Sequence, residues 1–160
     1  MPELQRLRLD HGPAVLAFER ENRAYFAKTV PDRGDAYFAE FDVRLAALLA
    51  EQATGVCQFH VLVEADEIIG RFNLVDLADG SAELGFRLAE KATGKGLATT
   101  TVRSLCDLAV RDYGLTSLRA GTTVTNTASQ AVLTRLGFTP TGETTLSGTP
   151  GLTYTLNLVS

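Results

Sequence analysis

Hydrophobic residues recur along the chain with two different periods, and each change of period marks a predicted element. From Cys57 to Val63 every second residue is apolar, and in an extended chain these residues all point to the same side. This alternation predicts a strand. From about Asp35 apolar residues recur at spacings of three and four, which predicts one amphipathic helix. The apolar stripe of that helix is formed by Phe38, Phe41, Leu45, Leu48 and Leu49.

The same pattern over the whole chain predicts an α/β fold with the order β-α-α-β-β-β-α-β-α-β-β. Pro13 suits the first turn of a helix, because an N–H at that position has no intrahelical partner. Gly114 and Gly137 are typical of positions just past a helix end. The predicted strands cover about residues 4–9, 57–64, 68–74, 82–89, 118–125, a segment from 138, and 152–158, and the predicted helices cover about 13–24, 35–49, 96–113 and 126–136.

Composition limits the classes of function that this chain can have. Hydrophobic residues make up 45%, which is enough to form a core, and 160 residues without a linker or repeat indicate a single domain over residues 1–160. A net charge of −4 argues against a general nucleic-acid binder, which needs an excess of Lys and Arg. No apolar run approaches the roughly 20 residues that span a bilayer. Residues 1–4 lack the order of a signal peptide, so we expect a cytoplasmic protein without a membrane partner.

Cysteine and histidine give no independent sign of a catalytic or metal site. Cys57 and Cys106 both lie in apolar patterns and are interpreted as buried thiols rather than a disulfide or a nucleophile. His11 is expected in a loop, and His60 is expected half-buried in a strand. Because no cluster of His, Cys or carboxylates has the spacing of metal ligands, we expect no metal.

The segment from Glu83 to Ala98 carries the clearest chemical signal. A predicted strand leads into a loop with Gly94 and Gly96, and a helix begins there. The first turn of a helix has N–H groups without partners and a partial positive charge, and glycines allow an anion to approach the backbone closely. The segment therefore fits a phosphate or pyrophosphate site, although a tight turn between strand and helix explains the glycines equally well. Neither the dinucleotide fingerprint nor the Walker loop fits the spacing.

The loop that does fit belongs to the GNAT acetyltransferases, which this chain resembles. The family signature is Arg or Gln, two residues, Gly, one residue, and Gly or Ala; here these positions hold Lys91, Gly94 and Gly96, so the first one departs from the pattern. A second motif, Asn126 to Ser129 followed by Leu-Gly-Phe at 136–138, resembles the branch that contains the ribosomal-protein N-terminal acetyltransferases. The resemblance covers residues 57–160 well and the first fifty residues in outline.

The resemblance implies a fold and a set of coenzyme A contacts. The expected fold is a mixed, mostly antiparallel central sheet flanked by helices, in which the fourth and fifth strands splay apart around the pantetheine arm. Gly85 is a candidate for a bulge that begins the splay. Asn126 is expected to bond the pantetheine, although Asn is also a favoured helix cap. The expected contacts are Leu84, Gly85, Phe86, Arg87, Leu88, Lys91, Thr93, Gly94, Lys95, Gly96, Leu97, Ala98, Asn126 and Ser129.

The implied activity is transfer of an acetyl group from acetyl-coenzyme A to an amine. Many family members have a Tyr as proton donor at the position of Leu133, which leaves Ser129 as the candidate donor. Ser129 can also be a local hydrogen-bonding residue in the first turn of a helix. Glu83 is the candidate base, and the alternative is a solvated carboxylate or one paired with Arg87.

The acceptor is constrained only through its pKa. At pH 7 an α-amine is roughly one-tenth neutral, whereas about one lysine amine in 2,500 is neutral, so a weak base suits a peptide α-amine or another low-pKa amine. The loop between the first two helices shapes the acceptor site in this family, and Tyr25 either lines that site or belongs to the core. The competing hypothesis is a coenzyme A-binding or sensing domain without turnover. A homodimer is compatible with both hypotheses.

Overall fold

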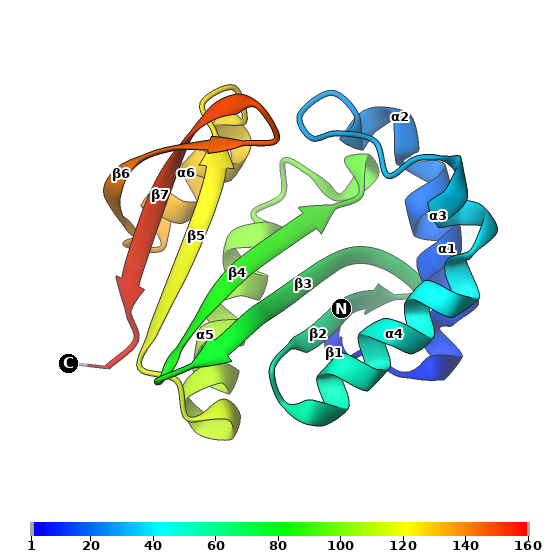
Figure 1. Cartoon of the computed structure of the whole chain (residues 1–160), viewed down its shortest axis with the longest axis horizontal. Helices are drawn as coiled ribbons and strands as arrows, with labels where there is room; N and C mark the ends of the chain where they lie inside the picture. Colours follow the sequence, from blue (N-terminus) through cyan, green and yellow to red (C-terminus); the bar gives the residue numbers. More distant parts are fainter. Residues whose placement is uncertain (1, 160) are drawn as a thin grey trace.

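The computed structural model describes residues 2–159, and its elements follow the predicted order (Figure 1). The strands are β1 (Glu3–Arg6), β2 (Gln58–Glu64), β3 (Glu67–Ala78), β4 (Ser81–Leu88), β5 (Ser117–Thr123), β6 (Thr139–Leu146) and β7 (Thr149–Asn157). The helices are α1 (Gly12–Glu21), α2 (Arg23–Phe26), α3 (Asp35–Ala39), α4 (Phe41–Thr54), α5 (Leu97–Tyr113) and α6 (Thr127–Arg135), with short 3-10 turns η1 (Leu9–His11) and η2 (Glu90–Ala92).

The strands of residues 2–159 form one sheet with the order β1-β2-β3-β4-β5-β7-β6. Neighbouring strands are antiparallel except β4 and β5, which are parallel. A parallel pair needs a crossover connection, which η2 and α5 provide. The prediction of a mixed, mostly antiparallel sheet flanked by helices is therefore confirmed.

Helices cover both faces of this sheet. Figure 1 shows α5 and α6 behind the sheet, while α4 crosses in front of it. On the front side α1 contacts β3 and α4 contacts β2. Between α5 and the sheet, Leu105, Phe72 and Leu118 are completely buried and form the centre of the core.

No helix within residues 2–159 combines the length and the apolar character that crossing a membrane requires.

The single helix predicted from residue 35 is wrong, because the structure divides it into α3 and α4. The break is at Glu40, whose φ of −108° and ψ of 23° are not helical. The apolar stripe continues across the break because both pieces pack on the same core. The rings of Tyr37 and Phe41, one from each piece, meet edge to face with their centroids 5.8 Å apart. Hydrophobic spacing reports which face is buried and does not report a local change of φ and ψ.

Two other expectations were incomplete at the N-terminal side of the chain. The strand predicted to reach Leu9 ends at Arg6, and Leu9 lies exposed in η1. The first helix ends at Glu21 rather than Ala24, because Asn22 interrupts it and its side chain bonds the Phe18 carbonyl oxygen at 2.9 Å. Periodicity places element ends less accurately than element centres.

Buried His60 and the free thiols are structural groups. His60 was expected half-buried but is almost fully buried, with Nδ1 at 3.0 Å from the Phe72 carbonyl oxygen and Nε2 at 2.7 Å from the Tyr113 hydroxyl. Burial lowers the pKa of His60 to about 4, so the ring is neutral at pH 7. Cys57 is buried and Cys106 partly buried, both as free thiols. Burial raises the pKa of Cys106 to about 11, which makes it a poor nucleophile.

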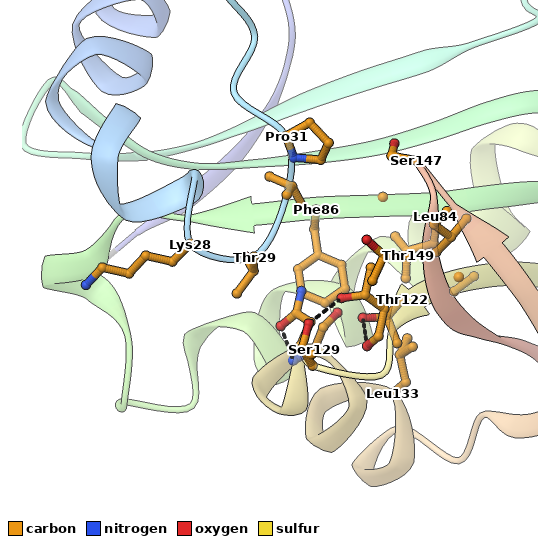
Figure 2. A pocket seen from close by; sticks show the side chains of 18 of the residues that line it. Lys28, Thr29, Pro31, Leu84, Phe86, Thr122, Ser129, Leu133, Ser147 and Thr149 are labelled. Atoms are coloured by element: carbon orange, nitrogen blue, oxygen red, sulfur yellow. Dashed lines mark hydrogen bonds between the residues drawn. The ribbon is translucent and has the colours of Figure 1, made fainter.

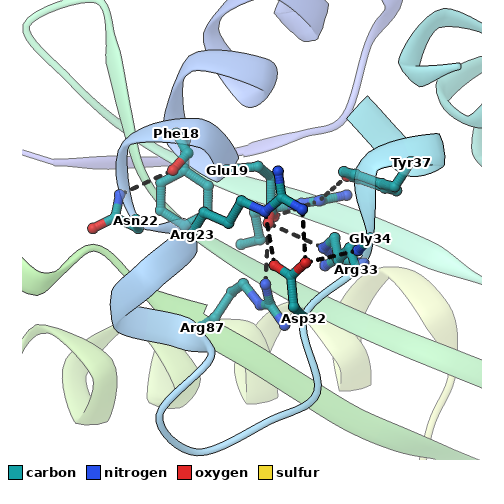
Figure 3. Close-up of polar contacts among 10 residues, drawn as sticks. Phe18, Glu19, Asn22, Arg23, Asp32, Arg33, Gly34, Tyr37 and Arg87 are labelled. Carbon is teal, nitrogen blue, oxygen red and sulfur yellow. Dashed lines mark hydrogen bonds and ion pairs between the residues drawn. The ribbon is translucent and has the colours of Figure 1, made fainter. Parts of the chain in front are cut away.

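An ion cluster around Glu19 joins the front helices to the sheet (Figure 3). Arg71 of β3 and Arg87 of β4 lie directly opposite each other, a like-charge pair that repels. The buried Glu19 carboxylate compensates for this repulsion: Arg71 donates to it at 2.8 Å and Arg87 at 3.0 Å. Arg33, from the segment between α2 and α3, donates to the same carboxylate at 3.0 Å, and Arg71 also donates to the Tyr37 hydroxyl at 3.3 Å. One carboxylate thus links a helix, two strands and a loop.

Glu19 makes stability depend on pH in a defined direction. Burial by itself raises the pKa of the Glu19 carboxyl, but the guanidinium charges outweigh burial and hold the pKa below its usual range. A group with a lowered pKa in the folded state stabilises the fold above its unfolded pKa, which is about 4.3 for Glu. That stabilisation is lost as the pH falls through the lower, folded pKa.

We predict that Glu19→Gln lowers the free energy of unfolding at pH 7 by about 3–5 kcal/mol, because it leaves buried guanidinium groups without a counter-charge. Urea denaturation measures this loss, and the difference from wild type should shrink below about pH 4. Glu40→Gln is the matched control, because Glu40 forms an exposed pair with Arg44 at 3.9 Å; it should cost no more than about 0.5 kcal/mol. Equal losses for the two variants, or a difference that does not change with pH, would contradict this assignment.

Candidate functional site

A cavity of about 440 Å³ lies where β4 and β5 separate (Figure 2). The parallel ladder between them ends at the pair Leu84–Ala120, and beyond it β4 stays paired with β3 and β5 with β7. This divergence is the splay that the family resemblance implied. The cavity is lined by Ala27, Lys28, Thr29, Val30 and Pro31, by Leu84, Gly85 and Phe86, by Ala120, Gly121, Thr122, Thr123, Thr125 and Asn126, by Ser129 and Leu133, and by Leu146, Ser147 and Thr149.

Gly85 begins the splay, but the prediction that it forms a bulge is wrong. It pairs with Asn73 of β3 in a continuous register, and the register shift in this ladder lies between Val75 and Ala78. Gly85 is exposed, and a Cβ built on it would meet nothing within 4 Å. The position is therefore open space beside the cavity rather than a local distortion of the strand.

The wall of the cavity is rich in hydroxyl groups. Thr122, Ser129 and Thr149 contribute hydroxyls from β5, α6 and β7. Among the lining residues that the structure describes, the ionisable side chain is that of Lys28, and no carboxylate lines the wall. Leu133, at the position where many family members have a Tyr, is fully buried next to Ser129. The cavity can therefore bind and orient a polar chain, while a base has to act from its edge or through water.

The predicted phosphate loop has the backbone that the glycines suggested. Gly94 has a φ of 77° and Gly96 a φ of 74°, values that side-chain-bearing residues rarely adopt. Gly96 is the N-cap of α5 and offers no side-chain cap, so the first N–H groups of this 17-residue helix are free to bind an anion. Thr93, Gly94, Lys95 and Gly96 are all exposed. The loop is accessible and carries the positive end of a long helix dipole.

Lys91 is oriented differently from the expected phosphate contact. Its Nζ lies 2.6 Å from a Glu67 carboxylate oxygen at the surface and 4.0 Å from that of Glu21. The hydrogen bond to Glu67 raises the pKa of Lys91. The Thr93 hydroxyl donates to the Glu90 carbonyl oxygen at 2.7 Å. A role of Lys91 at a phosphate therefore requires that it exchange Glu67 for the ligand.

Asn126 caps α6, and it also lies in the cavity wall. Its Oδ1 accepts the backbone N–H of Ser129 at 3.2 Å, as expected for a cap. Both residues line the cavity, and Figure 2 shows Phe86 of β4 extending toward Ser129. The two interpretations of Asn126 are thus compatible, because capping uses Oδ1 and leaves the amide N–H groups available.

Glu83 is on the opposite face of β4 from Leu84 and Phe86, as predicted, and it is exposed outside the cavity wall. The alternative that Glu83 pairs with Arg87 is wrong, because Arg87 donates to Glu19 instead. Tyr25 is half-buried against the core and is not part of the wall. Residues 27–31 form this side of the cavity in its place.

Most of the cavity wall outside the two motifs was not predicted from the sequence. The missed residues come from the loop 27–31, from Thr122 and Thr123 of β5, and from the turn around Ser147. The loop carried a signal, since Pro31 and Gly34 interrupt the helix pattern there. For Thr122 and Ser147 no local signal existed, because their role depends on where β5 and β7 lie in the sheet.

A model of the GNAT acetyltransferase domain matches residues 3–139, which is most of the chain. The chain belongs to the GNAT acetyltransferase family. An uncharacterized N-acetyltransferase of Bacillus licheniformis is 35% identical over 88 residues, which cover 53% of this GNAT chain and 49% of that protein, so the match spans about half of the relative's length. The sequence motifs that indicated the family are therefore supported by an independent match.

Solved structures agree with this GNAT fold. The ribosomal-protein-S5-alanine acetyltransferase of Vibrio fischeri has a TM-score of 0.90 at 20% identity, covering 98% of this chain and 92% of that one. RimJ of Mycobacterium smegmatis, in complex with a coenzyme A disulfide, has a TM-score of 0.87 at 21% identity, covering 98% and 81%. These likenesses establish the fold.

Within residues 2–159, no group of three or more His, Cys, Asp or Glu side chains is arranged to hold a metal.

Proposed function

We propose that this GNAT domain transfers an acetyl group from acetyl-coenzyme A to an amine, preferably a peptide α-amine or another amine of low pKa. The observation that carries the proposal is that one chain combines a cavity between splayed strands with an uncapped helix N-terminus. The splay between β4 and β5 opens a cavity of about 440 Å³, and the open N-terminus of α5 follows β4 in the chain. A long ligand with an anionic end and a slender amide-bearing arm matches this pair of features.

The residues present fit coenzyme A. In the proposal the pyrophosphate binds the backbone N–H groups between Thr93 and Ala98, with Lys95 nearby. The pantetheine arm lies along Leu84 to Leu88, where β4 no longer pairs with β5, and it bonds the Asn126 amide. RimJ of Mycobacterium smegmatis, which has the same fold, was solved in complex with a coenzyme A disulfide. A cytoplasmic location is consistent with acetyl-coenzyme A as cosubstrate.

The reaction needs little from the protein beyond positioning and proton transfer. The neutral amine attacks the thioester carbonyl, a C–N bond forms, the C–S bond breaks, the sulfur leaves with the electron pair and the nitrogen loses a proton. A thiol of pKa about 8.5 leaves as an anion at pH 7 at a cost of about 2 kcal/mol, so a donor helps modestly. Ser129 is the proposed donor and Glu83, through water, the proposed acceptor of the amine proton.

A second candidate is a coenzyme A-binding or sensing domain without turnover. It is favoured by Leu133 at the position of the usual hydroxyl donor and by the absence of a carboxylate from the described cavity wall. Release of free thiol from acetyl-coenzyme A with a panel of amines separates the two functions. Amine-dependent release supports the transferase, whereas coenzyme A binding without release from any amine supports the second candidate.

We predict that Gly96→Val weakens coenzyme A binding at least tenfold, about 1.4 kcal/mol, because a β-branched residue is strained at a φ of 74° and blocks approach to the N–H groups. Titration calorimetry measures the affinity. Gly114→Val, at the other end of α5 with a φ of 64°, is the control for backbone strain. It should lower the Tm similarly and leave the affinity unchanged; an equal loss of affinity in both variants would remove the phosphate site from this loop.

Replacement of Ser129 tests the proposed proton donor. Ser129→Ala keeps the backbone N–H that Asn126 caps and removes the hydroxyl, so it should lower kcat more than it raises the KM for acetyl-coenzyme A. Steady-state kinetics with one fixed amine measures both constants. An unchanged kcat would assign Ser129 to helix structure alone.

The pH dependence of the rate tests the proposed role of Glu83. The rate should rise with pH and follow the acceptor's own pKa, because only the neutral amine attacks. Glu83→Gln should slow an α-amine acceptor modestly, and its effect should shrink as the pH rises. The measurement is a pH–rate profile for wild type and variant with one α-amine and one lysine-type acceptor. A loss above a thousandfold that is independent of pH and acceptor would make Glu83 an essential group and contradict this mechanism.

A further inference from the structure

We propose that the front face of β4, from Gly85 at the cavity to the gap beside Arg33 and Arg87, is an acceptor groove with a carboxylate subsite at these two arginines, and that preferred acceptors carry an acidic side chain close to the amine. This inference rests on the proposed function and names a substrate class for it. One face of β4 carries Glu83, Gly85 and Arg87, whose partners across the ladder are Val75, Asn73 and Arg71.

The amine end of this groove lies at Gly85. Gly85 lines the cavity, is exposed, and has room on its front side, where a Cβ would meet nothing within 4 Å. Directly opposite, the Oδ1 atom of Asn73 is buried and has no hydrogen-bond partner within residues 2–159. An unpaired buried acceptor is costly, and an amine N–H bound over Gly85 is the kind of donor that it lacks.

The other end of the groove has a surplus of positive charge. Within the described residues, the guanidinium groups of Arg33, Arg71 and Arg87 share the single carboxylate of Glu19. Arg71 is buried and also bonds Tyr37, whereas the side chains of Arg33 and Arg87 are 34% and 22% exposed. Burial, followed by the charge of Arg33, lowers the pKa of Arg87, as expected for a cation that is not fully compensated.

Arg33 and Arg87 also have unused donors. Arg33 donates to Glu19 through Nε and Arg87 through Nη1, and their other N–H groups have no protein acceptor in residues 2–159. A small gap of about 10 Å³ lies against both side chains, and Pro31 lines both this gap and the main cavity. The carboxylates at the gap are already paired, Glu19 with the arginines and Asp32 with Arg23 at 2.8 Å. An added carboxylate at its mouth would therefore meet free donors.

The spacing selects the position of the acid. Gly85 and Arg87 are two residues apart on one strand face, so their Cα atoms are about 7 Å apart. In the proposal a peptide whose α-nitrogen binds over Gly85 runs toward Arg87 and brings the side chain of its second residue to the two arginines. The surplus of positive charge also disfavours a bound ammonium and acceptors with several amines, because like charges repel at short range. The expected class is a peptide with a free α-amine and Asp or Glu at its second position.

The test compares two peptides that differ by one charge, Ala-Glu-Ala-Ala and Ala-Gln-Ala-Ala, each with an amidated C-terminus. With wild type, kcat/KM for the Glu peptide should be about tenfold higher, the size expected for one charge-assisted hydrogen bond. Arg33→Gln, on a partly exposed loop, should abolish the preference, and Arg33→Glu should reverse it toward a peptide with Lys at the second position. Arg111→Gln is the matched control, because it removes one positive charge from α5 far from the groove and should keep the preference.

A binding measurement separates failure of this inference from failure of the proposed function. The N-acetylated forms of the two peptides are titrated into the protein saturated with coenzyme A. Tighter binding of the Glu form that is lost in Arg33→Gln supports the subsite, even if no amine is turned over and the transferase proposal fails. Turnover with equal binding and equal kcat/KM for the two peptides overturns the subsite and leaves the transferase in place. A preference for the Gln or Lys peptide in wild type also overturns it.

Discussion

The end of the β4–β5 ladder at Leu84 and Ala120 is the constraint on which the site depends. Two parallel strands that separate leave backbone N–H and C=O groups directed into the gap, and such groups need partners. Neither strand can close the gap, because β4 is held by β3 on one side and β5 by β7 on the other. The sheet is therefore built with an unfilled edge inside it, and a ligand with amide groups completes it in our proposal.

The ion cluster at Glu19 determines how the acceptor side faces that gap. A buried carboxylate is a poor source of net stability but a strong constraint on geometry, because its partners must converge on two oxygens. Here it fixes Arg33, which follows the loop 27–31 that lines the cavity, to Arg87 of the splayed strand. The loop has no regular secondary structure of its own to hold it. Backbone hydrogen bonds to α2 hold its first residues, and the charge pairs of Arg33 with Glu19 and of Asp32 with Arg23 attach the segment that follows it.

The two faces of β4 divide the proposed chemistry. Leu84 and Phe86 face the cavity side toward α6, whereas Glu83, Gly85 and Arg87 face the front groove. Alternation along a strand thus places the coenzyme and the acceptor on opposite sides of one short segment, with Gly85 as the gap through which they meet. A Cβ at Gly85 would meet nothing within 4 Å, so packing does not require a glycine there; in our proposal the missing side chain leaves room for the acceptor.

The sequence by itself determined the order of the elements, the glycine loop before the helix that is α5 in the structure, and the family, because these follow from local periodicity and from motifs of fixed spacing. It could not place the break at Glu40, the full burial of His60, or the orientation of Lys91 toward Glu67. Only the tertiary structure decided which hydroxyls line the cavity and that Glu19 pairs with arginines from 14 to 68 positions away. Those contacts join segments distant in the chain, and hydrophobic periodicity carries no information about which polar groups such segments bring together.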